Sequence, residues 1–400
     1  MNALSGDTPI FAEVDGKYGV YTLQELFELH NEGKKIRVPA LLNKRGKKIW
    51  VEVEDVVSFG TQPLKQIMLA TTHLFVKVSE DTIIPAYSMR LFRGKEKLIL
   101  KFKFVNELKV TQFANNDTIL LTMRIHLNLP EGDQTEWEHG FALGFYIAEG
   151  STLKRKRSFS KRSLEKLNGF AKNRGMALQD YLNYMSNIKL VILTVGEPDF
   201  ERGFIDNIKR HFKFSKSHKR KVANAYDLYS SDLRYIHLIK ENVDGYTSHD
   251  KHLKNVVYNR SLKFLAGILD GFLAGDGTYI KNMNLFAVNI TTNYRLYNDL
   301  IFLSKALGYD VHINKGSFGK SPSSNKFYYA LRLSILKNWH RFSAFGLVKE
   351  RIKMVENAGV KEAFNLVLKP LYEENDKRAK FNRLYFTAYG FLVSDAVKTF

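Results

Sequence analysis

Two apolar stretches, each ending in an acid followed by glycine, constrain the fold of this chain more than any other feature. They are Ala142–Gly150 and Leu265–Gly277. Each reads as a helix, although glycine costs up to ~1 kcal/mol relative to alanine inside a helix. Small residues on one helix face allow two backbones to approach closely, so we expect the two helices to pack side by side. That packing would bring Glu149 and Asp276 together at one end.

The two stretches resemble the paired signature helices of LAGLIDADG homing endonucleases, which cleave DNA with a divalent metal held between two such acids. The first copy has Glu149 where the family has aspartate, a change that keeps the carboxylate. The resemblance implies that Glu149 and Asp276 are catalytic and bind metal, with Gly150 and Gly275 beside them in the metal site. It also implies Mg²⁺ as the cofactor, which Mn²⁺ can replace.

The same family places a basic residue near each acid, where it orders water or stabilises charge. The candidates in this sequence are Lys251 and Lys349, with Lys254 and Lys353 as alternatives. A lysine most often lies on the protein surface. An ordinary surface position is therefore the competing interpretation for each of them.

Similar elements follow the two acids, which indicates an internal repeat. The first copy is expected to have a strand at 189–194, a helix at 201–212 and a strand at 225–230; the second, a strand at 284–291, a helix at 294–307 and a strand at 327–334. The first copy also holds an insertion at about 155–185, with helical patterns at 164–170 and 177–185. The repeat predicts two α+β halves of αββαββα-like order, related by a pseudo-twofold axis.

The basic charge of the chain is unevenly distributed. Residues 1–150 carry 18 Lys+Arg against 19 Asp+Glu, residues 151–250 carry 20 against 11, and residues 251–400 carry 23 against 11. The surplus begins at the first acid-tipped helix, which predicts a polyanion partner for this part of the chain. A basic surface that only keeps the protein soluble is the alternative. Cysteine is absent, which excludes disulfides, thiolate metal sites and a cysteine nucleophile.

Twinned halves suit double-stranded DNA, because a duplex has a local dyad and a two-stranded ribbon fits its major groove. We expect a monomer that binds a long, asymmetric target site. The residues expected to contact DNA are Lys154, Arg155, Lys156, Arg157, Asn289, Thr291, Asn293, Lys315, Lys320 and Lys326. The four that open the insertion are expected to contact phosphates, with a nuclear-localisation patch or an undirected charged face as alternatives. A solvated loop is the alternative for the others.

The first 130 residues read as an all-β unit, because short strands alternate with turn signals. The expected strands lie at 17–23, 35–42, 48–57, 66–70, 74–78, 97–104 and 118–125. The clearest helix in this part is 23–29, with Thr22 as its N-cap. Near the other end, the pattern predicts a helix at 361–372, followed by two strands around a turn.

Both ends of the chain resemble the splicing domain of an intein, which has the Hint fold. The resemblance is carried by Gly6-Asp7-Thr8 near the start, by a Thr-Thr-His triplet, and by Gly390–Val393 near the end. It implies that the splicing positions are Ala3, Thr71, Thr72, His73, Ser394, Asp395 and Ala396. In the family, a Thr-x-x-His motif polarises the first scissile peptide. Here Ala70 stands where that threonine is expected, and Thr71 comes one residue late.

Three of these positions lack the groups that splicing requires. The first step needs a thiol or hydroxyl, which Ala3 does not have, and the later acceptor position holds Ala396. Release needs an asparagine amide nitrogen, and Asp395 has none. We therefore expect that this polypeptide does not splice.

The predicted organisation is a splicing domain at 1–132 and 363–400, interrupted by an endonuclease at 133–362 with halves at about 133–260 and 261–362. The expected function is that of an intein whose endonuclease cleaves the allele lacking the element. Its partners would be DNA and flanking host-protein segments, inside the cell and without a membrane. An RNA-binding maturase and a freestanding endonuclease or DNA-binding regulator are the alternatives.

Overall fold

The computed structural model divides the chain into two units. Unit 1 comprises Met1–Asn128, Tyr279–Thr292 and Tyr297–Phe400, and unit 2 comprises Leu129–Thr278 and Asn293–Leu296. The residues that the structure describes are 3–42, 47–69, 75–92, 95–104, 118–121, 127–153, 161–173, 175–186, 190–201, 203, 205–219, 224–248, 250–280, 285–291, 293–307, 309–313, 317–320, 327–336, 348–368, 382–387 and 390–395. None of the helices within these ranges is long and apolar enough to cross a membrane.

Most of unit 1 is one largely antiparallel sheet that joins the two ends of the chain, in which β23 pairs parallel with β4. Its elements are β1 (Leu4–Ser5), β2 (Pro9–Val14), β3 (Lys17–Thr22), α1 (Leu23–Asn31), β4 (Ile36–Leu42), β5 (Lys47–Leu69), β6 (Phe75–Ser79), β7 (Ile83–Phe92), β8 (Lys95–Phe104), β9 (Thr118–Leu121), β21 (Val348–Leu368), β22 (Asn382–Thr387) and β23 (Gly390–Asp395). The strand order is β22-β23-β4-β5-β6-β1-β21-β9-β7-β8, and β2 pairs with β3 and β4. The expected all-β character of this part is confirmed.

The long strand β21 corrects the expected helix at 361–372. Its residues pair with β5, where Val360 lies opposite Pro63, and with β1, where Phe364 lies opposite Leu4. Gly359 interrupts the strand with a φ of 78°, a conformation that glycine adopts readily. The helical pattern was misleading because pairing with two distant strands decides the conformation here, and a local pattern does not record such partners.

Unit 2 is built around the two predicted helices. Its elements are α2 (Gln134–Glu149), β10 (Gly150–Leu153), α3 (Lys161–Lys172), α4 (Leu178–Ser186), β11 (Leu190–Gly196), α5 (Glu197–Glu201), α6 (Asp206–His211), β12 (Lys216–Lys219), β13 (Ala225–Ser230), α7 (Leu233–Asn242), β14 (Val243–Asp244), β15 (His252–Leu253), η3 (Asn255–Asn259) and α8 (Leu262–Asp276). The single helix expected at 201–212 is two short helices instead. The helix expected over the stretch Leu265–Gly277 is confirmed as α8.

The second copy of the repeat forms its own sheet. Its elements are β16 (Gly277–Ile280), β17 (Leu285–Thr291), α9 (Tyr294–Ala306), β18 (Asp310–Ile313), β19 (Ser317–Lys320) and β20 (Phe327–Leu336). The order is β16-β17-β20-β18, with β19 also pairing with β20, while the first copy has β10-β11-β13-β12. In both sheets the strand that comes last in the chain, β13 or β20, therefore lies between the second and the third strands.

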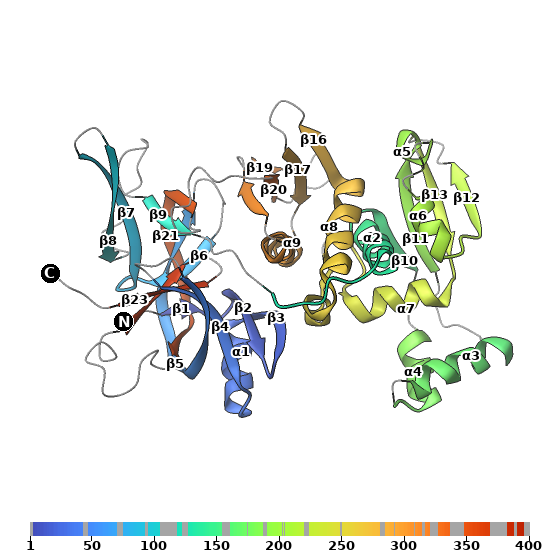
Figure 1. Cartoon of the computed structure of the whole chain (residues 1–400), viewed down its shortest axis with the longest axis horizontal. Coiled ribbons are helices and arrows are strands. Elements are labelled where there is room, and N and C mark those ends of the chain that lie inside the picture. Colours follow the sequence, from blue (N-terminus) through green and yellow to red (C-terminus); the bar gives the residue numbers. More distant parts are fainter. Residues whose placement is uncertain are drawn as a thin grey trace. The chain divides into compact units, whose positions relative to one another are not determined.

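The helices α2 and α8 pack with their backbones in contact, and Figure 1 shows them side by side. A Cβ atom at Gly140 would lie 2.2 Å from the carbonyl oxygen of Phe264, and one at Gly144 would lie 2.0 Å from that of Ile268. Real Cβ atoms do not approach a backbone oxygen so closely, so no side chain larger than hydrogen fits at these two positions.

Two glycines of α8 make the reciprocal contacts with α2. A Cβ atom at Gly267 would lie 2.1 Å from the carbonyl oxygen of Trp137, and one at Gly271 would lie 2.1 Å from that of Phe141. The contacts made by α2 are thus repeated by α8. The glycines weaken each helix alone, and the close contact between helices offsets that cost.

Gly144→Ala tests this explanation, because alanine normally stabilises a helix. In this interface the added methyl group meets the Ile268 backbone, so we expect the free energy of unfolding to fall by about 3 kcal/mol. Gly169→Ala in α3 is the matched control, since nothing lies within 4 Å of its Cβ position; it should stabilise by up to ~1 kcal/mol. Chemical denaturation measures both, and equal effects of the two variants would refute the close-contact explanation.

Candidate active site

Both predicted acids stand at the ends of the packed helices. Glu149 is the last residue of α2 and Asp276 the last residue of α8, and each is followed by an extended C-cap glycine. Each acid follows the two contact glycines of its own helix at the same spacing. The reciprocal helix contacts therefore place the two acids in equivalent positions.

The packing at this end brings the Glu149 side chain beside α8. A Cβ atom at Gly275 would lie 3.0 Å from Cγ of Glu149 and 2.6 Å from Cβ of Ala148. The lack of a side chain at Gly275, immediately before Asp276, therefore allows the two helices to approach each other closely at this end. This packing brings together three residues that are expected in the metal site: Glu149, Gly275 and Asp276.

The environment of Asp276 disfavours its charged form. The side chain is exposed at the end of α8, but the protein around the carboxyl removes enough water to raise the pKa of Asp276 to about 6, while the positive charge of Lys251 acts in the opposite direction. Burial is the larger cause. Within the described residues, no hydrogen-bond donor reaches this carboxyl. A cation beside Asp276 would supply the missing counter-charge.

Lys251 is fully buried and holds the end of α2. Its Nζ donates hydrogen bonds to the carbonyl oxygens of Ile147 (2.7 Å), Gly150 (2.7 Å) and Tyr146 (3.1 Å). The carbonyl of Ile147 is one that a helix C-terminus leaves without an intrahelical partner, whereas that of Tyr146 also accepts from the N–H of Gly150. Burial lowers the pKa of Lys251 to about 8, and the negative charges of Asp276 and Glu149 oppose that shift. The carbonyl of Gly150, expected in the metal site, is thus engaged by lysine.

A small hairpin delivers Lys251 to this position. Strands β14 and β15 pair, and the Asp250 carboxylate in the loop between them accepts hydrogen bonds from the backbone N–H groups of Tyr246 (3.0 Å) and Thr247 (2.5 Å). Gly245 has a φ of 78°, and a Cβ atom there would lie 2.2 Å from the carbonyl oxygen of Asp250. The loop is therefore closed by its own hydrogen bonds just before Lys251. No sequence motif identifies this hairpin loop.

Asn293 helps to hold Lys251 in place and does not lie on an exposed DNA-binding surface. Its side chain is buried and donates hydrogen bonds to the carbonyl oxygens of Lys251 (2.6 Å) and Ser248 (3.3 Å). Its own carbonyl accepts from the N–H of Leu296 (3.1 Å), in the first turn of α9. The expected DNA contact of Asn293 is therefore corrected. A DNA contact was expected because an isolated asparagine before a helix gives no sign in the sequence of tertiary partners.

The remaining predicted residues of the endonuclease are placed less completely. Lys349 lies in β21, and its backbone pairs opposite Leu120 of β9. Asn289 and Thr291 lie in β17 and Lys320 lies in β19. The residues that fall outside the described ranges are Lys154, Arg155, Lys156, Arg157, Lys315 and Lys326. Their roles stay predictions.

Ala3, the predicted first splicing position, is buried and held by polar groups. Its N–H lies 3.3 Å from Thr82 Oγ1 and 3.4 Å from Ser79 Oγ, and its carbonyl accepts from the Ser79 N–H at 2.9 Å and from Thr82 Oγ1 at 3.2 Å. Its side chain packs with Leu64 and Ala363. A buried alanine with both backbone groups bonded is well positioned, but it carries no nucleophile.

The other splicing positions are described only in part. Ser394 and Asp395 lie in β23, where they pair opposite Arg383 and Asn382 of β22. Ala396 and the triplet of Thr71, Thr72 and His73 lie outside the described residues. Their splicing roles stay predictions.

The donor set fits a divalent cation such as Mg²⁺. Two carboxylates are hard oxygen ligands, and Mg²⁺ commonly binds through one or two carboxylates while keeping water molecules and substrate phosphates as its other ligands. In the described ranges, no cluster of three or more His, Cys, Asp or Glu side chains could hold a metal alone. A cation at Glu149 and Asp276 would therefore need ligands from water and substrate.

Comparison with known proteins gives one curated relative. The chain is 22% identical over 312 residues to the DNA-directed RNA polymerase subunit Rpo1C of Methanocaldococcus jannaschii, an alignment that covers 75% of this chain and 31% of that protein. The chain thus spans about a third of its relative. No family model matches.

Solved structures similar to the chain are of two kinds. An intein from a hyperthermophile has 23% identity and a TM-score of 0.24, covering 30% of this chain and 72% of that one. The structure of I-DmoI in complex with DNA and Ca has 12% identity and a TM-score of 0.30, covering 51% of this chain and 85% of that one. Inteins and LAGLIDADG homing endonucleases are the two families that the sequence motifs resemble.

The shifted pKa of Asp276 predicts a pH-dependent effect of its removal. The folded protein binds this proton more tightly than an unfolded chain, whose ordinary value is 3.8, so stability falls as pH rises from about 4 through 6. Without added metal, we expect Asp276→Asn to raise the free energy of unfolding at pH 8 by roughly 1 kcal/mol, allowing for solvent screening. The gain should shrink at pH 4. Chemical denaturation at both pH values measures the free energy of unfolding of the variant and of the unchanged chain. An equal difference between the two proteins at pH 4 and pH 8 would contradict the raised pKa of Asp276.

Proposed function

We propose that this chain is an intein that carries a LAGLIDADG-type endonuclease, which hydrolyses double-stranded DNA with a divalent metal. The observation that carries the proposal is the pair of carboxylates, Glu149 and Asp276, at the ends of two helices whose backbones touch. The proposed domains are a splicing domain at 1–132 and 363–400 and an endonuclease at 133–362, with halves at about 133–260 and 261–362. Access to chromosomal DNA places this function inside the cell.

The residues have distinct proposed roles in hydrolysis. Glu149 and Asp276 would hold the cation, Mg²⁺ or Mn²⁺. When bound, it would stabilise the charge of the phosphate and lower the pKa of a water molecule. Lys251 fixes the end of α2, and its charge partly balances the two acids. Lys349 is the proposed basic residue of the second half.

The proposed DNA site rests on the repeated sheets and the basic charge. Two sheets with the same strand order suit the two halves of a DNA site, and the surplus of basic residues begins at residue 151. The proposed contacts are Asn289, Thr291, Lys315, Lys320 and Lys326, with Lys154, Arg155, Lys156 and Arg157 on phosphates. A monomer with two unequal halves would read a long, asymmetric site.

Splicing is proposed to be disabled in this chain. The positions of the first nucleophile, the cyclising asparagine and the acceptor hold Ala3, Asp395 and Ala396. Host-protein segments would flank both ends of an intact element. The similarity to 31% of a longer RNA polymerase subunit fits an element that lies inside a host protein.

Cleavage of a plasmid that carries the reconstructed insertion site tests the endonuclease. The unchanged chain should linearise it with Mg²⁺ and leave it intact with a chelator. Glu149→Gln combined with Asp276→Asn should lower the rate by more than about a hundredfold, because both proposed metal ligands are lost.

Asp270→Asn is the matched control for this experiment. Asp270 lies on the same helix as Asp276 but accepts a hydrogen bond from Nε1 of Trp137 (2.9 Å), which an asparagine oxygen can also accept. Its cleavage rate should stay near that of the unchanged chain. Full cutting by the double variant would contradict the proposed endonuclease site. Tight binding of structured RNA by the unchanged chain, without plasmid cutting, would favour a maturase.

Restoring the missing nucleophiles tests the splicing proposal. Ala3→Cys, Asp395→Asn and Ala396→Cys together should ligate two flanking tags, whereas the unchanged chain should ligate none. A gel that separates precursor from ligated tags reports the result. Ligation by the unchanged chain would contradict the proposal, and failure of the triple variant would locate a further defect at positions such as Ala70 or Ser394.

A further inference from the structure

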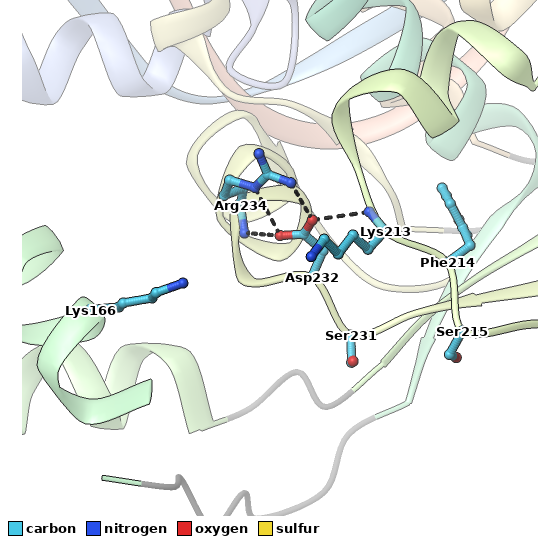
Figure 2. A pocket seen from close by; sticks show the side chains of 7 residues that line it. All are labelled: Lys166, Lys213, Phe214, Ser215, Ser231, Asp232 and Arg234. Carbon is cyan, nitrogen blue, oxygen red and sulfur yellow. Dashed lines mark hydrogen bonds and ion pairs between the residues drawn. The ribbon is translucent and has the colours of Figure 1, made fainter. Parts of the chain in front are cut away.

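A basic cleft in unit 2 lies outside the proposed metal site. It has a volume of about 700 Å³ and is lined by Lys166, Lys213, Phe214, Ser215, Ser231, Asp232 and Arg234. Figure 2 shows Lys166, from the insertion helix α3, on one side of the cleft, and Lys213, Phe214 and Ser215 on the other. The lining therefore combines the insertion, the approach to strand β12 and the start of α7.

Asp232, the one carboxylate among the residues that line the cleft, already accepts four hydrogen bonds. Asp232 caps α7 and accepts hydrogen bonds from the backbone N–H groups of Arg234 and Lys213, both at 3.0 Å. The Arg234 guanidinium donates to the same carboxylate through Nη2 (2.8 Å) and Nε (3.2 Å). These donors keep the pKa of Asp232 below its ordinary value although burial acts in the opposite direction and is the largest single effect. Asp232 thus joins the Lys213 loop to α7.

The two lysines are available for a ligand. Lys166 and Lys213 are exposed, and neither has an ion-pair partner within the part of the chain that the structure describes. Three cations and one carboxylate give the lining a net charge of +2. An anion is therefore the complementary ligand.

The position of Lys166 is fixed by packing between α3 and α7. Phe170 stacks on His237 of α7 with ring centroids 6.0 Å apart, and Leu167 is buried. Lys166 lies one helical turn before Phe170, and Arg234 lies one turn before His237, so both cations are on the faces that meet. Tyr181 of α4 also contacts His237, edge-on at 6.1 Å. The insertion is thus anchored with its lysine beside the start of α7.

We propose that this cleft binds a segment of the DNA sugar–phosphate backbone, outside the part of the duplex that is cut. The inference rests on the proposed endonuclease function and adds a second contact region for the same DNA. The open cleft has room for several atoms of a backbone beyond one phosphate, and its cations come from separate elements held in a fixed arrangement. The insertion thereby gains a role in positioning DNA.

Salt-dependent binding of the full chain to a fluorescent 40-bp duplex tests this proposal. Lys166→Gln with Lys213→Gln should weaken binding about tenfold and reduce the slope of log K against log salt by about 2, because each phosphate contact contributes about 0.9. Lys166→Arg with Lys213→Arg should restore both values. Anisotropy titrations from low to moderate salt give the slope.

Lys172→Gln with Lys263→Gln is the matched control. Both residues are exposed lysines of unit 2 that do not line the cleft, and the pair removes the same charge. Its salt slope should stay near that of the unchanged chain. An unchanged slope in the cleft variant, or equal loss in both variants, would overturn this proposal alone. Failure of the unchanged chain to bind any duplex would overturn the proposed function as well.

Discussion

The contact between the backbones of α2 and α8 is the constraint on which the proposed site depends. Helices that meet through larger side chains are separated by roughly 8–10 Å between axes. Here Gly144 and Gly271 allow the backbone of each helix to touch the other. The same approach continues to the helix ends, where Glu149 lies beside Gly275. Two carboxylates can therefore share one site although neither helix carries both.

The helix contacts relate the two acids, and further residues support the end of α2. The end of α2 is held by the buried Lys251, whose position depends on a self-closed hairpin loop and on Asn293. Both helices also close on their own backbone, at Gly150 through the carbonyl of Tyr146 and at Gly277 through that of Leu273.

The insertion in the first half has a defined place in unit 2. Its helices pack on His237 of α7 through Phe170 and Tyr181, and this packing brings Lys166 next to a basic cleft. Beside α7 in Figure 1, α3 and α4 form a separate layer of unit 2. A polyanion partner, inferred from charge alone, thus has two candidate contact regions: the proposed acid site and the cleft.

The sequence by itself determined the elements whose signal is local. The helix Leu262–Asp276 begins at the Ser261 cap, and α1 begins at Thr22, because capping and apolar periodicity act over a few residues. The paired acids were also evident, since both helices end in the same acid–glycine pattern. Only the tertiary structure decided that 348–368 is a strand, that the buried Asn293 donates to the carbonyl of Lys251, and that Lys166 and Arg234 line one cleft. Each of these depends on partners distant in the chain, and a local pattern does not record which distant residues will supply hydrogen bonds or remove water.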